Sequence, residues 1–279
     1  MAKKTKTNKT RRVTLSARNA DRQVLYEAAV QCPEAEIGFL ERRFLKLRGR
    51  RPMSLREDFC ASAASACEWV KRRRTNTALG LDLDPDILKW AAEHNLAKLD
   101  QDQRSRIELR ERNVLDPGPN SGGFDIVASM NFSYNAFKTR ETMLKYFKLV
   151  RASLKPDGIY FLDGFGGWES MKVQQERRRI KGGFTYVWDQ ASFDPITHDM
   201  TCHIHFEFRD GSKLKKAFTY EWRLWTLPEL QELLREAGFK NVTVYWEGDD
   251  KKGSGNGVFT PKAHGEDGPS FIVYLTAER

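Results

Sequence analysis

The sequence lacks the features of a membrane protein and of a disulfide-bonded secreted domain. No apolar run reaches the roughly 18 residues that a spanning helix needs. Its 279 residues include four cysteines, and no two of them form a CxxC pair. The Lys-rich start is not followed by the apolar stretch of a signal peptide. We therefore expect a cytoplasmic protein with reduced thiols and no membrane contact.

The sequence also has no net charge beyond its first 51 residues. Residues 1–51 hold 14 Lys and Arg against 5 Asp and Glu, which equals the formal charge of +9. The whole chain has 47 Lys and Arg and 38 Asp and Glu, so the residues after position 51 include 33 basic and 33 acidic ones. We predict that residues 1–22 form a disordered basic arm, either a solubilising terminus or a segment that attracts nucleic acid. The neutral remainder does not favour a folded nucleic-acid-binding surface.

Two helices are expected between this arm and the first strand. Apolar residues recur at helical spacing after Asp21, a suitable N-cap, and this helix should end near Gln31. Pro33 separates it from a second apolar stretch, which Gly49 ends. Residues 23–51 are thus predicted to be an N-terminal helical lid.

Strand patterns then alternate with helical ones. The five strands expected in this part are Met53–Phe59, Ala78–Asp84, Ile107–Arg112, Phe124–Met130 and Ile159–Asp163. Right-handed crossovers through the intervening helices give a parallel sheet with helices on both faces. Two later strands, Val242–Trp246 and Phe271–Leu275, complete it. The fold class predicted is α/β, with a Rossmann-like, doubly wound sheet that is seven-stranded and mostly parallel.

Residues 168–226 have the period of two that is typical of half-buried strands. Three such runs, around Trp188, Ile204 and Tyr220, predict an inserted antiparallel β flap with one apolar face. Asp210-Gly211 favours a hairpin between the last two. The Gly-rich segment Gly248–Gly268 is expected to be a mobile loop. The predicted domains are therefore a cofactor-binding half (52–167), the flap (168–226) and the C-terminal part of the sheet (227–279).

The carboxyl ends of the predicted strands carry the candidate site, because open α/β sheets bind ligands there. Asp82 ends the second strand and is placed to accept both hydrogen bonds of a ribose diol. Asn113, Asn131 and Asp163 end or follow the next three strands. No GxGxxG fingerprint is present, so a nucleoside-bearing ligand is favoured over a dinucleotide.

Five short strings in a fixed order resemble the class I S-adenosylmethionine-dependent methyltransferases. The resemblance covers about residues 24–276 and is closest to a subgroup with an Arg-Glu-Asp-Phe-Cys first motif. The strings are Leu55–Cys60, Gly80–Pro85, Asn131–Tyr134, Trp222–Leu230 and Glu236–Phe239. In this chain Phe59, Ala61 and Ala63 stand where the family has three glycines.

The resemblance implies S-adenosylmethionine as cofactor and assigns residues to it. Glu57 would lie near its amino group, Asp82 would hold the ribose, and Asn131 would line the methionine end. The further residues implied at the cofactor are Tyr26, Arg56, Cys60, Ala61, Leu83, Asn113 and Val114. Of these, Tyr26 would belong to the lid, Arg56 would face the cofactor carboxylate, and Cys60 is expected to be a small packing residue.

Methyl transfer from a sulfonium is an in-line displacement, so the protein mainly supplies proximity and orientation. The residues expected on the acceptor side, and named here as catalytic candidates, are Asn131, Tyr134, Asp163 and Arg223. Tyr134 fits a packing role as well, and Arg223 fits an ion-pair partner. No metal is expected, because His203 and His205 share their strand face with charged neighbours.

Three functions remain open at this point. The first is methylation of a small-molecule acceptor. The second is an RNA- or ribosome-associated methyltransferase that uses the basic arm, whose binding should weaken with salt. The third is a non-catalytic ligand-binding protein on the same fold, since the family glycines are missing.

Overall fold

A main sheet of eight strands forms the centre of the molecule in the computed structural model, which describes residues 14–250 and 255–279. In chain order its strands are β1 (Ser54–Asp58), β2 (Thr77–Asp82), β3 (Ile107–Glu111), β4 (Phe124–Ser129), β5 (Leu154–Gly166), β10 (Lys240–Asp249), β11 (Gly255–Pro261) and β12 (Phe271–Glu278). Their spatial order is β11-β10-β12-β5-β4-β1-β2-β3. The five neighbouring strands β3, β2, β1, β4 and β5 are parallel to one another. Strand β12 is antiparallel to both β5 and β10.

The sheet confirms the predicted α/β class but not the predicted strand number. The eighth strand, β11, pairs antiparallel with β10 inside the segment that was expected to be a mobile loop. Glycines at 255 and 257 and the absence of an alternating pattern concealed this strand in the sequence. A register shift between Glu247 and Asp249 also marks its pairing as irregular.

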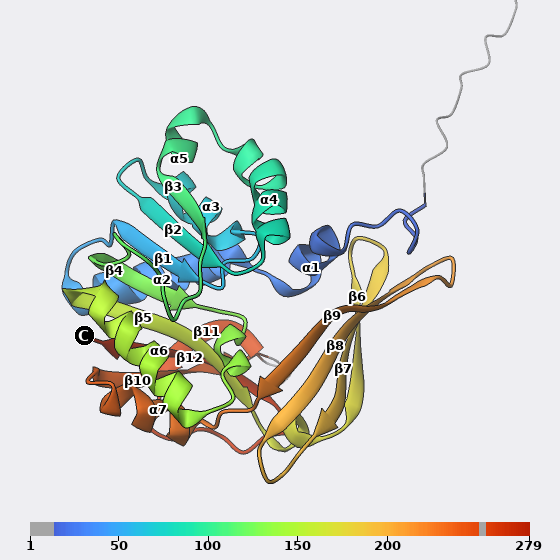
Figure 1. The fold of residues 1–279 in the computed structure, drawn as a ribbon. Coiled ribbons are helices and arrows are strands. Elements are labelled where there is room, and N and C mark those ends of the chain that lie inside the picture. Colours follow the sequence, from blue (N-terminus) through green and yellow to red (C-terminus); the bar gives the residue numbers. More distant parts are fainter. Residues whose placement is uncertain (1–13, 251–254) are drawn as a thin grey trace, which may run out of the picture.

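Helices cover both faces of the sheet, as Figure 1 shows. On one face lie α6 (Arg140–Ser153) and α7 (Leu227–Glu236), whose apolar sides pack against Tyr160 and Leu162 of β5. On the other lie α3 (Ala64–Arg72) and α4 (Pro85–His94), near Ile159 and Phe161. The short elements of the described chain are α5 (Gln101–Ser105) and the 3-10 turns η1 (Leu96–Lys98), η2 (Ser133–Ala136) and η3 (Trp168–Met171). Alternate residues of β5 thus enter opposite cores.

The two N-terminal helices are present, and they are built into the body of the molecule. Helix α1 (Arg22–Val30) is capped by Asp21, and α2 (Pro33–Arg48) begins at Pro33 and ends at Gly49 in a left-handed cap. Buried residues of α2 join the core beneath α3. Leu25 and Ala29 of α1 pack against the inserted sheet. Both helices therefore have a packing role, and a closing lid movement stays a prediction.

The insertion is a second sheet of four antiparallel strands, not three. It consists of β6 (Gln174–Ile180), β7 (Phe184–Phe193), β8 (Asp199–Phe208) and β9 (Lys213–Arg223), in that order. Figure 1 shows it as a long ribbon beside the main sheet. The strand missing from the prediction, β6, is an edge strand of mostly charged, exposed residues. Edge strands carry such charge because it prevents further strand pairing, and the charge hides the strand pattern.

Part of the predicted basic arm is ordered against this second sheet. Met1–Val13 lie outside the described residues. Beyond them, the backbone N–H of Ala17 donates to Ser212 Oγ at 3.0 Å, and Leu15 packs beside the apolar cluster of the sheet. The prediction of disorder is therefore wrong for residues 14–22. None of the described helices is both long and apolar enough to cross a membrane.

A buried ion pair joins β1 to the face covered by α6. Arg56 and Asp58 have no exposed side-chain surface, and their two hydrogen bonds are each 2.8 Å long. Tyr146 of α6 also donates to Asp58, and Arg56 donates to Ser153 Oγ. Each charge is thus compensated, which a buried pair requires.

Replacing Asp58 with Asn should lower the free energy of unfolding by about 3–5 kcal/mol, because it leaves the Arg56 charge buried and uncompensated. Glu108→Gln is the matched control, since Glu108 pairs with Arg110 at the surface and such pairs contribute about 0–1 kcal/mol. Urea unfolding of both variants measures the two losses. Equal losses would contradict the role assigned to the buried pair.

Candidate active site

The turn from β1 into α3 has an unusual backbone. Phe59, Ala61 and Ala63 have φ angles of 58°, 43° and 55°. These are the three positions at which the resembled family has glycine. Side chains disfavour this left-handed region, and each such residue costs about 1–3 kcal/mol. The turn therefore keeps a glycine-like path although no glycine is present.

Asp82, at the carboxyl end of β2, holds this turn in place. Its Oδ2 accepts the backbone N–H of Ala61 at 2.8 Å, and its Oδ1 accepts that of Asp84 at 3.1 Å. Cys60 N–H donates to the carbonyl of Leu81, and its buried side chain packs against Gly80, where a Cβ would lie 2.8 Å from Sγ. Burial raises the pKa of the Cys60 thiol well above its usual range. Cys60 is thus the packing residue that was predicted, and not a nucleophile.

Glu57 points from β1 to the start of α3. Its Oε2 accepts the N–H of Ala66 at 3.0 Å, within the first turn of that helix. Burial raises the pKa of Glu57 to about 8 against the effect of this hydrogen bond, and the negative charges of Glu36 and Asp82 raise it further. The structure thus brings Glu57, Ala61 and Asp82 together around one turn.

Glu36, on α2, is a buried acid that the sequence analysis missed. It accepts a hydrogen bond from Ser65 at 3.2 Å, and burial raises its pKa. Its position could have been found, because Glu36 falls in line with Leu40 and Phe44 on the buried side of the helix. A carboxylate in an apolar stripe is the available signal.

The predicted adenine side is open and apolar. Leu83 follows Asp82 and is 63% exposed, which is high for a leucine beside a strand end. Asn113 is exposed, and its Oδ1 accepts the N–H of Leu115. The Val114 side chain lies in the core. If Val114 contacts a ligand, it must do so through its backbone.

Asp163 ties the ends of β4 and β5 together. Its two carboxylate oxygens accept the backbone N–H groups of Asn131 and Phe132 at 2.7 and 2.9 Å, and both donors have φ of 58°. Burial raises the pKa of Asp163 to about 8 despite these bonds, and the charge of Glu36 adds to the rise. Buried Tyr134 donates its hydroxyl to the Asp163 carbonyl. Asp163 therefore positions the backbone of Asn131, and Tyr134 is bonded to the backbone of Asp163.

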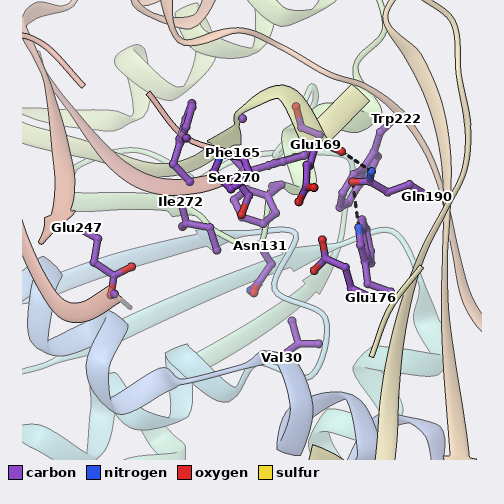
Figure 2. Close-up of a pocket in the computed structure, with 18 of the residues that line it drawn as sticks. Val30, Asn131, Phe165, Glu169, Glu176, Gln190, Trp222, Glu247, Ser270 and Ile272 are labelled. Carbon is purple, nitrogen blue, oxygen red and sulfur yellow. Dashed lines mark hydrogen bonds between the residues drawn. The ribbon is translucent and has the colours of Figure 1, made fainter. Parts of the chain in front are cut away.

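A cavity of about 690 Å³ opens beside Asn131, between the main sheet and the second sheet. Tyr26 of α1 lines it, as do aromatic residues of the second sheet and Phe132, Phe165 and Phe271 of the main domain. Figure 2 shows Asn131 among these residues, with Gln190 bonded to the backbone carbonyl of Glu169. Burial raises the pKa of Tyr26 to about 12. Of the predicted site residues, Asn131 and Tyr26 line this cavity.

Two predicted site residues lie elsewhere. Neighbouring residues of a strand point to opposite faces, so Arg56 points away from Glu57 and into its pair with Asp58. The prediction that Arg56 faces the cofactor is therefore wrong. Arg223 pairs with Glu229 at 2.9 Å and stacks on Trp225, which is the ion-pair alternative given for it.

The paired histidines of β8 have protein partners. His203 lies near Thr219, and His205 contacts Asp189 at 3.0 Å. No group of three metal-ligating side chains exists in the part of the chain that the structure describes.

Replacing Ala61 with glycine should leave the free energy of unfolding unchanged or raise it by up to about 1 kcal/mol, because it relieves the left-handed strain. Ala92→Gly, inside α4, is the control and should lower it by about 1 kcal/mol. Denaturant unfolding compares the two variants. An equal loss in both would show that the turn carries no strain at Ala61.

The raised pKa of Glu57 gives a pH dependence. The folded state binds this proton up to about pH 8, whereas the unfolded state releases it near 4.5. The stabilisation is therefore complete below the unfolded pKa and is lost as pH rises through about 8. We expect the melting temperature of the ligand-free protein to fall between pH 6 and about 9, and Glu57→Gln to reduce that fall. An equal slope in the variant would assign the effect to other groups.

No family model matches the chain. The putative methyltransferase YqeM of Bacillus subtilis is 26% identical over 169 residues, which are 58% of this chain and 64% of that protein. The match thus spans a little less than two thirds of the relative.

Solved structures with the same arrangement cover nearly the whole chain. An S-adenosylmethionine-dependent methyltransferase from Clostridium acetobutylicum has a TM-score of 0.67 at 13% identity, covering 92% of this chain and 96% of its own. CalS10 from Micromonospora echinaspora, an amino pentose methyltransferase with S-adenosylmethionine bound, has 0.66 at 16% identity, covering 92% and 95%. This chain therefore has the Rossmann-like fold of the class I S-adenosylmethionine-dependent methyltransferases.

Proposed function

We propose that this protein transfers a methyl group from S-adenosylmethionine to a small molecule held beside Asn131. One observation carries the proposal: Phe59, Ala61 and Ala63 keep the left-handed path of a glycine turn, and the half-buried Asp82 carboxylate lies against it. A strained backbone is retained where function requires it. The turn and the carboxylate together form the cradle for a nucleoside.

The residues present fit S-adenosylmethionine, which supplies an electrophilic methyl group when bound. Asp82 has acceptor capacity left for the ribose hydroxyls, and the exposed Leu83 offers an apolar surface to the adenine. Glu36, Glu57 and Asp163 are buried carboxyl groups bonded to hydroxyl or backbone donors. A ligand with an ammonium and a sulfonium charge suits their environment.

The acceptor would occupy the 690 Å³ cavity, because Asn131 lines that cavity and would also line the methionine end of the cofactor. The aromatic walls of the cavity can contact and orient a small molecule, which is what methyl transfer requires of a protein. CalS10, which shares the fold, acts on an amino pentose. That supports an acceptor of small size. We place the protein in the cytoplasm. The nucleic-acid alternative depends on the basic residues 1–22, of which Met1–Val13 lie outside the described residues.

Asp82→Asn should weaken binding of S-adenosylmethionine by about 10- to 100-fold, because it removes the charge that accepts the ribose hydroxyls and keeps a side-chain oxygen for Ala61. Asp86→Asn is the control. Asp86 is exposed in the first turn of α4, close to Asp82 in the chain. The affinity of the Asp86→Asn variant for S-adenosylmethionine should change less than about twofold. Isothermal titration calorimetry measures both.

Three outcomes would count against the proposal. The absence of heat with S-adenosylmethionine or S-adenosylhomocysteine would overturn the cofactor assignment. Tight binding without methylated product across a broad acceptor set would favour the non-catalytic alternative. Unchanged affinity in Asp82→Asn would remove Asp82 from the site.

A further inference from the structure

The cavity beside Asn131 is lined by charged groups of one sign. Its acidic lining residues are Glu169, Glu176, Glu247, Asp249, Glu266 and Asp267, and no Lys, Arg or His is among the described residues that line it. The chain as a whole has a net charge of +9. The acidic lining is therefore a local feature of the cavity.

The acids come from separate parts of the fold. Glu169 and Glu176 lie on the side of the second sheet, and Figure 2 shows them across the cavity from Glu247 of β10. Surrounding a cavity with like charges raises the free energy of the empty protein. A bound cation would relieve that cost.

Protein cations neutralise this lining only in part. Lys172 pairs with Glu169 at 3.2 Å and Lys262 with Glu266 at 2.6 Å, both near the surface. Glu176 and Glu247 form no ion pair within the described part of the chain; Glu176 accepts from Gln174, and Glu247 accepts the N–H of Gly257.

One arginine lies close to Glu176 but is engaged elsewhere. Arg178, two residues along β6, donates to the carbonyl of Ala29 and lies over the ring of Tyr186 at 5.4 Å. It does not line the cavity. The Glu176 carboxylate therefore remains available to a ligand.

The same cavity is also lined by aromatic side chains. Trp188, Tyr220 and Trp222 line it as a cluster, with ring centroids 4.5–6.0 Å apart. Aromatic faces attract ammonium groups and contact the apolar body of a ligand. Acidic and aromatic groups together are the combination by which proteins bind organic cations.

From this lining we propose that the methyl acceptor is an amine, bound as its ammonium form and methylated on nitrogen; the inference rests on the proposed function. Before transfer the bound ammonium releases one proton to water. The nitrogen lone pair then forms the N–C bond while the C–S bond breaks. The electron pair of the broken C–S bond stays on sulfur. The product is a methylated ammonium and a neutral thioether, so charge and atoms balance.

Acceptors of other charge fit less well. A phosphate or a carboxylate would bring a negative charge among the six acids, and desolvating that charge there is unfavourable. A neutral hydroxyl would gain no compensation from them. The lining therefore selects by charge before it selects by shape.

Three probes of similar size and different charge test this: benzylamine, benzyl alcohol and benzoate. Each is titrated by calorimetry into the full chain saturated with S-adenosylhomocysteine. Benzylamine should bind at least about tenfold more tightly than benzyl alcohol, and benzoate more weakly than either. Glu176→Gln combined with Glu247→Gln should reduce the benzylamine affinity about tenfold and leave benzyl alcohol unchanged.

Glu232→Gln is the matched control, because Glu232 is exposed on α7 and does not line the cavity. It should leave all three affinities unchanged. Benzylamine binding no tighter than that of benzyl alcohol, including no measurable binding of both, would overturn the amine assignment. So would equal losses in the double variant and the control. The preceding titration with S-adenosylhomocysteine separates this failure from failure of the proposed function, since cofactor binding without amine preference contradicts the acceptor class alone.

Discussion

Carboxylates that accept backbone N–H groups hold the carboxyl edge of the main sheet together. Asp82 binds the N–H of Ala61, and Asp163 binds those of Asn131 and Phe132. None of the five residues with positive φ around these bonds is glycine, and only Asn131 among them is of a type that tolerates this backbone region well. A hydrogen bond to a carboxyl oxygen offsets strain of this kind, and it is stronger where the carboxyl group is ionised. The carboxylates therefore fix the two turns between which a ligand would bind.

The same bonds have an electrostatic consequence. Holding two turns with acids, and adding Glu57 and Glu36 behind them, gathers negative groups in a buried region. Burial raises the pKa of Glu57 and of Asp163 to about 8, so part of this cluster is protonated in the ligand-free protein near neutral pH. A cationic ligand would favour the ionised forms. Binding of such a ligand at this edge of the sheet should therefore release protons. The stability of the two turns then depends on whether the ligand is bound.

Much of the fold around the proposed cofactor edge could be predicted from the sequence, because short strings encode it. Asp82 is recognisable from its place at a strand end, and the strand–helix alternation gives the parallel order of the sheet. Arg56 was misplaced although the period of two already sets it opposite Glu57. Edge strands β6 and β11 were not predicted, for different reasons. Most residues of β6 are charged, and β11 contains glycines. Contacts such as Arg56 with Ser153 join residues far apart in the chain, and periodicity does not report them.

The cavity proposed for the acceptor could not be predicted from the sequence, for a structural reason. Its cavity combines α1, the loop after β4, the second sheet and the segment before β12, and no single string contains it. These segments meet because the chain leaves the main sheet at Gly167, where φ is 100° and a Cβ would lie 2.4 Å from the carbonyl oxygen of Pro269. The departure angle of the second sheet thus depends on one glycine next to residues that line the cavity. Substitutions in an insertion attached in this way can change the lining of the cavity without changing the proposed cofactor edge of the main sheet. The cavity and that edge share little beyond Asn131. The charge of the lining is consequently better information on the acceptor than the fold is.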